Sequence, residues 1–202
     1  MSHSENSENK ELSKNSNEDI DKKNKNENID DEDEDDDNDY EILSPDYFKY
    51  DYNYKIIVIG DSGVGKTCLT YRASTGEYQD KISPTLGFEF SPFFFKNSSL
   101  AIIVYSIDNE NSFLSLEEWV RQCKGNCSPN TKFFLIGNKA DMKDDRVISY
   151  EKGKEIMEKN NFEKFMETSA KSGFNVNKLF CEVGKCLYKE TLKNSEVNKV
   201  SR

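Results

Sequence analysis

The sequence predicts an α/β fold: a doubly wound, mostly parallel sheet with helices on both faces. Short β-branched apolar runs alternate along the chain with segments of helical periodicity. A glycine-rich turn also links the first apolar run to a helical segment. Strands connected through helices pair in parallel, because each helix returns the chain to the same end of the sheet. With 202 residues, the chain has room for one domain of this kind.

The first strand is expected at residues 55–59, where a short β-branched run closed by glycine suits a strand buried on both faces. Similar runs predict strands at residues 100–105 and 132–136, and a fourth strand is expected to end at Phe165. Helices are predicted where apolar residues recur at spacings of three and four, at Phe113, Leu116, Val120 and Cys123, and later at Val176, Leu179, Phe180, Val183 and Leu187.

The acidic charge of the chain is concentrated in its first 50 residues. They contain 18 acidic and 6 basic side chains, a net charge of −12, whereas the remaining residues contain 20 acidic and 22 basic side chains, a net charge of +2. Such a polar stretch buries too little apolar surface to offset the entropy lost on ordering. We therefore expect a disordered acidic tail over residues 1–50, a folded domain over residues 51–192 and a flexible tail over residues 193–202.

Composition also limits the classes of function. No apolar run approaches the roughly 18 residues that span a bilayer, and no signal peptide precedes the domain, so we expect a cytoplasmic protein. Lys and Arg form no dense patch, so nucleic acid is not an expected partner. The five cysteines form no CxxC pair, and the single histidine, His3, lies in the acidic tail, so we expect reduced thiols and no zinc site.

Residues 60–67 read Gly-Asp-Ser-Gly-Val-Gly-Lys-Thr and match the phosphate-loop pattern GxxxxGK[ST] between a strand and a helix. Glycines let successive backbone N–H groups turn inward around phosphates at a helix N-terminus. Lys66 should reach the β- and γ-phosphates and is the candidate catalytic residue, and the Thr67 hydroxyl is placed to bind Mg²⁺. The expected phosphate contacts are Asp61, Ser62, Gly63, Val64, Gly65, Lys66, Thr67 and Cys68.

Residues 138–141, Asn-Lys-Ala-Asp, follow the third predicted strand directly and are candidates for reading the base. The Asp141 carboxylate can accept hydrogen bonds from N1–H and the 2-amino group of guanine, a donor pair that adenine lacks. Lys139 would lie along the base plane, and Asn138 would tie this loop to the phosphate loop. Guanine is therefore the expected base, and a P-loop ATPase or nucleotide kinase is the less favoured class.

A second candidate base loop, Glu-Thr-Ser-Ala-Lys at residues 167–171, follows the predicted strand that ends near Phe165. The backbone N–H of Ala170 would contact the guanine carbonyl oxygen, Ser169 lies in the same loop, and Lys171 would stack beside the base. Neither base loop is specific alone. Their order after a phosphate loop, each at a strand end, is what points to a guanine nucleotide.

Residues 54–189 resemble the Ras superfamily, and the stretches 54–69, 83–90 and 103–113, with the Leu116-x-x-Trp119 that follows, are similar to Rab proteins in particular. The resemblance implies a small GTPase that switches between GTP and GDP in vesicle-mediated transport and uses Mg²⁺. It implies Rab-type effectors, an exchange factor and an activating protein as partners, and we expect a monomer. By the same resemblance, Thr85 is the switch threonine that reaches Mg²⁺ and the γ-phosphate, and residues 86–90 form the effector-facing strand.

After Phe90 the chain departs from the family pattern, because no Asp-x-x-Gly occurs between Thr85 and Leu100. One central strand is thereby missing, together with the water-orienting glutamine that P-loop GTPases use. Residues 88–96 could pair in its place, but Pro92 lacks an N–H and argues against a regular central strand. Two explanations stay open: a segment lost through splicing or prediction of the coding sequence, or a naturally shortened pseudo-GTPase that binds guanine nucleotide without hydrolysing it.

The chain also ends differently from the family pattern. Rab proteins usually finish in prenylated cysteines, whereas residues 198–202 read Asn-Lys-Val-Ser-Arg and the last cysteine, Cys186, belongs to a helical pattern. We therefore expect no stable lipid anchor, and any association with the cytosolic face of endomembranes should be peripheral.

Overall fold

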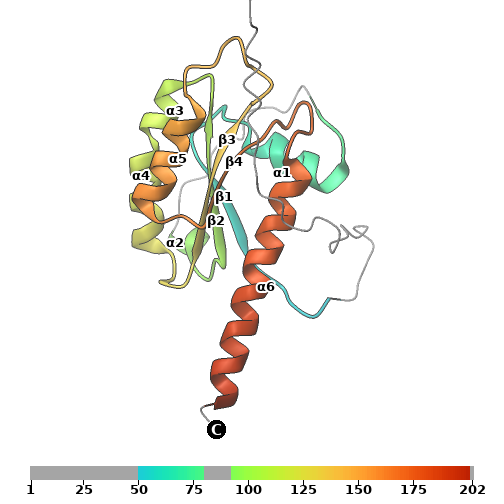
Figure 1. The fold of residues 1–202 in the computed structure, drawn as a ribbon, viewed down its shortest axis with the longest axis vertical. Coiled ribbons are helices and arrows are strands. Elements are labelled where there is room, and N and C mark those ends of the chain that lie inside the picture. The colour runs from blue at the N-terminus through green and yellow to red at the C-terminus, as the bar shows by residue number, and fades with distance from the viewer. Residues whose placement is uncertain (1–49, 80–91, 201–202) are drawn as a thin grey trace, which may run out of the picture. The chain divides into compact units, whose positions relative to one another are not determined.

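The computed structural model describes residues 50–79 and 92–200, with side chains to residue 195. The described residues form one parallel sheet in the order β1-β2-β3-β4 (Figure 1). Its strands are β1 (Ile56–Ile59), β2 (Leu100–Ser106), β3 (Lys132–Asn138) and β4 (Lys164–Glu167). Each strand runs into the next through at least one helix, so the predicted parallel α/β fold is confirmed.

Helices cover both faces of the sheet (Figure 1). On one face lie α1 (Lys66–Thr75) and α6 (Val176–Val200). On the other lie α2 (Pro92–Phe95), α3 (Glu110–Leu114), α4 (Leu116–Asn126) and α5 (Tyr150–Asn160). None of the described helices combines the length and apolar composition that crossing a bilayer requires.

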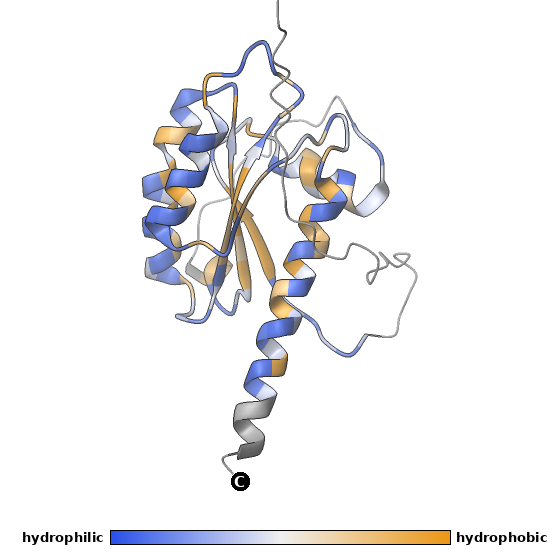
Figure 2. Ribbon diagram, in the orientation of Figure 1, coloured by the Kyte–Doolittle hydropathy of each residue, from blue (hydrophilic) through white to orange (hydrophobic). Residues whose placement is uncertain are grey.

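The core lies on either side of β2, whose residues are all buried. Alternate side chains of β2 point to opposite faces: Ile103 packs in the cluster that includes Val120 of α4, and Ile102 packs in the cluster that includes Leu179 of α6. Hydrophobic residues accordingly gather on the strands, while hydrophilic residues cover the outer sides of the helices (Figure 2). A strand buried on both faces was expected first at residues 55–59; β2 is buried throughout, whereas in β1 Ile57 and Ile59 are buried and Ile56 and Val58 only partly so.

The helices differ from the sequence prediction at three places. The pattern that starts at Phe113 spans two helices, because α3 ends at Leu114 and α4 begins at Leu116, with Ser115 between them. The helix α5 was not predicted at all. The flexible tail was expected from residue 193, whereas α6 continues to Val200.

The β1 edge of the sheet has no second strand partner among the described residues. The family pattern would place the missing central strand at this edge. Pro92 begins the helix α2, where its missing N–H costs no helical hydrogen bond. Lys55, just before β1, donates from Nζ to the carbonyl oxygens of Phe94 (2.8 Å) and Lys96 (2.9 Å), so it binds the C-terminal end of α2. Residues 92–96 therefore do not form a replacement strand, and residues 88–91 lie outside the described part of the chain.

Candidate nucleotide-binding site

The phosphate loop between β1 and α1 has a backbone that only glycine adopts easily. Gly60, Gly63 and Gly65 have positive φ angles of 139°, 81° and 93°. A Cβ atom on Gly60 would overlap the carbonyl oxygen of Val104, and one on Gly65 would lie 2.5 Å from Asn138 Nδ2. The phosphate loop therefore lies in close contact with β2 and with Asn138 at the end of β3, so a side chain at Gly60 or Gly65 would displace the loop.

The backbone N–H groups of residues 62–66 donate no hydrogen bond to another described residue. Gly65, the N-cap residue of α1, also supplies no side-chain cap. A run of unpartnered N–H groups at a helix N-terminus attracts anions, because the partial positive charges of the amides and of the helix dipole act together. These residues thus fit the phosphate groups predicted from the sequence.

The Lys66 side chain forms hydrogen bonds with the backbone of its own loop. Its Nζ donates to the carbonyl oxygens of Gly60 (2.8 Å) and Asp61 (2.6 Å). Burial lowers the pKa of the Lys66 ammonium below its usual value, and the Asp61 carboxylate opposes that effect only in part. The lysine is therefore a poorly solvated cation beside the unpartnered amides, where phosphate oxygens would stabilise its charge.

Two hydroxyl groups were predicted to bind Mg²⁺. Thr67 is the second residue of α1 and is exposed, so the residue lies at the surface next to the loop. Hydroxyl oxygens suit Mg²⁺, which also takes phosphate oxygens and water as ligands. Thr85, the other predicted ligand, and the effector-facing residues 86–90 lie outside the described residues.

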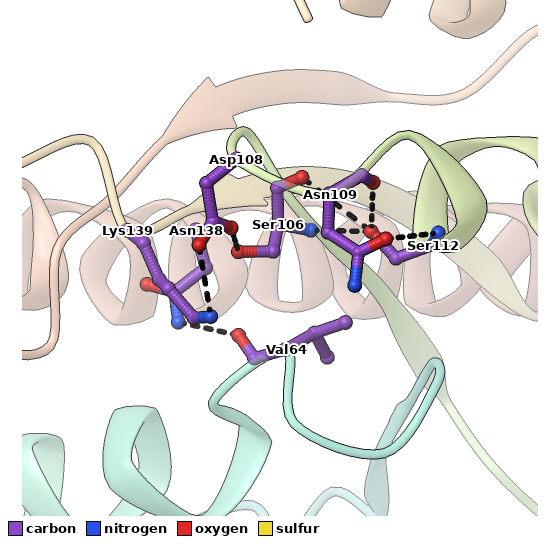
Figure 3. A network of polar contacts seen from close by, with 7 residues as sticks. All are labelled: Val64, Ser106, Asp108, Asn109, Ser112, Asn138 and Lys139. Atoms are coloured by element: carbon purple, nitrogen blue, oxygen red, sulfur yellow. Dashed lines mark hydrogen bonds and ion pairs between the residues drawn. The ribbon is translucent and has the colours of Figure 1, made fainter. Parts of the chain in front are cut away.

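Asn138 joins the phosphate loop to the second base loop, and Figure 3 shows its contact with Val64 of the phosphate loop. Its side chain is 1% exposed, Nδ2 donates to the carbonyl oxygen of Val64 (2.8 Å), and Oδ1 accepts from Thr168 Oγ1 (3.1 Å). The contact expected between the phosphate loop and the loop after β3 is therefore present. One buried amide couples the positions of all three loops.

The two base loops are held together edge to edge. The N–H of Ala140 donates to the carbonyl oxygen of Thr168 (3.0 Å), and Ser169 Oγ donates to Asp141 Oδ1 (2.5 Å). Ser169 is fully buried while Asp141 is exposed, so a fixed hydroxyl orients a carboxylate at the rim of the site. The N–H of Ala170 donates to no acceptor among the described residues. This N–H of the second base loop is therefore available to an acceptor on a ligand. Lys171 is exposed.

Lys139 has a φ of 64°, and its ammonium lies 3.3 Å from Asp108 Oδ2 (Figure 3). The Ser106 hydroxyl donates to the other oxygen of Asp108. Burial acts to raise the pKa of Asp108, but the hydrogen bond from Ser106 and the charge of Lys139 together hold it below its ordinary value. Asp108 therefore stays ionised and anchors Lys139, although the sequence analysis did not single it out.

Comparison with known proteins places the chain in a family. The model of the Ras family matches residues 55–93 and 90–189. Human Rab-8B (Homo sapiens) is 32% identical over 159 residues, which cover 65% of this chain and 76% of Rab-8B. RIC1, a Ras-related protein of Oryza sativa subsp. japonica, is 31% identical over 160 residues, covering 65% of this chain and 79% of RIC1. The chain belongs to the Ras family. It is a Rab-like small GTPase, as the sequence resemblance implied.

Two further contacts in this Ras-family site were missed by the sequence analysis. Arg146, in the loop after β3, forms a bidentate ion pair with Glu167 at the end of β4, with both N–O distances at 2.7 Å. Trp119 of α4 donates from Nε1 to Asp61 Oδ1 at 2.7 Å. Neither pair is close in sequence, so no local pattern could have found it. The sequence did contain two signals: the Leu116-x-x-Trp119 spacing, which marks the family resemblance, and the place of Glu167 at the start of the second base loop.

Proposed function

We propose that this Rab-like GTPase binds GDP and GTP between the phosphate loop and the two base loops, as a switch in intracellular vesicle traffic. The observation that carries the proposal is the buried side chain of Asn138, which joins Val64 of the phosphate loop to Thr168 of the second base loop. A nucleotide needs its phosphates and its base recognised at a fixed separation, and this amide fixes the separation.

Guanine is the base that the loops suit. Asp141 is oriented by Ser169 and retains carboxylate capacity to accept from N1–H and the 2-amino group of guanine. Adenine would bring a lone pair against that carboxylate. Hydrogen bonds to charged groups contribute roughly 1.5–3 kcal/mol each, so the site should discriminate strongly between the two bases.

The phosphates and Mg²⁺ would be bound by the residues around α1. Lys66 and the N–H groups of residues 61–68 would take the β- and γ-phosphates, and Thr67 would supply an oxygen to Mg²⁺, which neutralises phosphate charge when bound. Thr85 would supply the second hydroxyl. Lys66 is the residue that we expect to stabilise charge during hydrolysis.

Hydrolysis itself should be slow. No Asp-x-x-Gly stands between Thr85 and Leu100 to position the attacking water. In support, the alignment with Rab-8B spans 159 positions but uses only 65% of the 202 residues, so Rab-8B carries residues that have no counterpart here. The protein would then hold a nucleotide longer than its relatives before converting it.

The remaining assignments follow from the family. As a monomer over residues 51–192, the domain would present its switch segment to Rab-type effectors, an exchange factor and an activating protein. Contact with the cytosolic face of endomembranes would be peripheral and made through those partners. Residues 1–45 would be dispensable for nucleotide binding.

The test is base selectivity in the full chain. Asp141→Asn reverses the hydrogen-bonding pattern, so affinity for GDP should fall at least tenfold while affinity for xanthosine diphosphate rises. Asp144→Asn is the matched control, because Asp144 is an exposed aspartate in the same loop, and it should leave both affinities unchanged. Equal affinity of the native protein for GDP and ADP, or no gain for xanthosine diphosphate, would contradict the proposed site.

A further inference from the structure

A carboxylate in a phosphate loop is unfavourable for binding phosphate, because it repels the ligand and competes for the lysine that the ligand needs. Asp61 is the second residue after β1 and is half-buried, with Lys66 close by on the first turn of α1. Burial lowers the pKa of Lys66 and the Asp61 charge works in the opposite direction, which shows that the two charges act on each other. Something must keep the carboxylate from pairing with the ammonium.

The side chain that meets the Asp61 carboxylate is the indole of Trp119. Its Nε1 donates to Asp61 Oδ1 at 2.7 Å, a short hydrogen bond to a charged acceptor. Trp119 is the fourth residue of α4, and its ring packs against the same core cluster as Ile57 and Ile59 of β1. The helix therefore fixes the ring, and the ring fixes the carboxylate.

Lys66 meanwhile contacts the backbone of the loop and not this carboxylate. Its two hydrogen bonds go to the carbonyl oxygens of Gly60 and Asp61. Carbonyl oxygens are weaker partners of an ammonium than a carboxylate is, so phosphate oxygens can replace them at lower cost. An Asp61–Lys66 ion pair would have to be broken before the lysine could bind a phosphate.

We propose that Trp119 is a positioning residue of the phosphate site, whose indole N–H holds the Asp61 carboxylate away from Lys66 and so keeps the lysine available to the β-phosphate. The proposal rests on the nucleotide-binding function proposed above. It assigns a role to the contact between α4 and the phosphate loop. Recognition of the base does not depend on that contact.

The inference predicts an effect confined to one phosphate position. In Trp119→Phe the ring still fills the core but the carboxylate is released, so affinity for GDP should fall about tenfold, the loss typical of one hydrogen bond to a charged group. Affinity for GMP, which lacks the β-phosphate that Lys66 reaches, should stay within about twofold of the native value. The ratio of GDP to GMP affinity therefore reports the phosphate side alone.

Rescue separates the proposed role from a loss of packing. Asp61→Asn in the Trp119→Phe background keeps the backbone N–H but removes the charge, and should return the GDP-to-GMP ratio to within about threefold of the native ratio. Phe133→Leu is the packing control, because Phe133 is a partly buried aromatic of the same core cluster that contacts Phe162. It should lower stability and leave the ratio unchanged.

The single tryptophan allows a measurement that needs no Trp119 variant. The one indole N–H resonance of the ¹⁵N-labelled protein should shift in Asp61→Asn, since its charged acceptor is removed. An unmoved resonance, an unchanged GDP-to-GMP ratio in Trp119→Phe, or no rescue in the double variant would each overturn the inference. A native protein that binds no GDP would instead refute the proposed function, so the two failures are distinguishable.

Discussion

The base side of the site, formed by the loops at residues 138–141 and 167–171, is held by hydrogen bonds between side chains of the two loops. The phosphate loop is held by contacts from Asn138, Trp119 and its own Lys66. Thr168 and Ser169 are fully buried and bonded to Asn138 and Asp141. On the phosphate side, five consecutive N–H groups of residues 62–66 have no partner among the described residues. If the proposed function holds, the base side is organised before a nucleotide binds, and the nucleotide phosphates would complete the phosphate side.

This difference follows from the positions of the strands. The loops after β3 and β4 leave adjacent paired strands, so their residues are close whether or not a nucleotide is bound. The phosphate loop leaves β1, which pairs only with β2 in the described part of the sheet. Changes at the base side should therefore cost folding stability first, and changes at the phosphate side should cost affinity first.

The largest expected effect is on folding, in Arg146→Ala. Glu167 is 8% exposed, so loss of the bidentate partner would leave a buried carboxylate unpaired and lower the free energy of unfolding by about 3 kcal/mol. Urea denaturation measures this. Arg121→Ala is the control, because its ion pair with Glu118 is exposed to solvent and should therefore contribute far less to stability. Equal losses in the two variants would mean that the base side is not held by this pair.

Asn138→Ala should lower both the folding stability and the retention of GDP. It leaves the Val64 carbonyl and the Thr168 hydroxyl without their partner, which should lower the free energy of unfolding by about 2 kcal/mol. Dissociation of GDP should also become faster, because the loops are no longer tied at a fixed separation. Denaturation and nucleotide-release kinetics test the two effects. A stability loss with unchanged release would show that the loops keep their separation without the amide.

A smaller, pH-dependent effect is expected in Asp108→Asn. Because the pKa of Asp108 is lowered in the folded state, its ionised form stabilises the fold above the unfolded pKa of about 3.9, and that contribution is lost as pH falls through the folded pKa. The variant should be less stable than the native protein by up to about 1 kcal/mol at pH 7. The difference should shrink as the pH is lowered below 4. A difference that stays constant with pH would exclude the ion pair as its cause.

Removal of residues 1–45 should have the smallest effect on either side. The deletion keeps Tyr52, whose ring lies 6.0 Å from that of Tyr188, and Tyr54, which is hydrogen-bonded to Thr191 of α6. Affinity for GDP at physiological salt should therefore stay within about twofold, since no motif residue is removed. A tenfold loss would place the acidic tail on the domain.

The predictable parts of the fold were those encoded locally. Continuous apolar runs located β1, β2 and β3, and the motifs after β1 and at the end of β3 located the phosphate loop and the first base loop. The helix α5 was missed because its apolar positions are few and Gly153, which breaks the pattern, is buried against Phe165. Packing against β4 compensates for the weak local signal. Helix propensity calculated from the local sequence does not include this tertiary packing.

In the site, sequence motifs identified residues that would face the ligand but not those that hold them. Asp141 and Asn138 belong to recognisable loops, whereas Arg146, Asp108 and Trp119 act through contacts that arise only once the sheet is assembled. The Leu116-x-x-Trp119 spacing marks the family resemblance, but it does not show that the indole contacts the phosphate loop. The roles of Arg146, Asp108 and Trp119 depend on the strand order, which places separate segments side by side.

The central claim is that the base side is complete while the phosphate side lacks what positions the attacking water. Single-turnover GTP hydrolysis on the full chain, loaded with GTP and Mg²⁺, tests it with and without a Rab-type activating protein. We expect a rate below the family's intrinsic rate, which is on the order of 10⁻⁴ s⁻¹, and no acceleration, because an inserted arginine stabilises charge without orienting water. Acceleration by the activator that disappears in Lys66→Ala would contradict the claim and show that another residue of this chain positions the water.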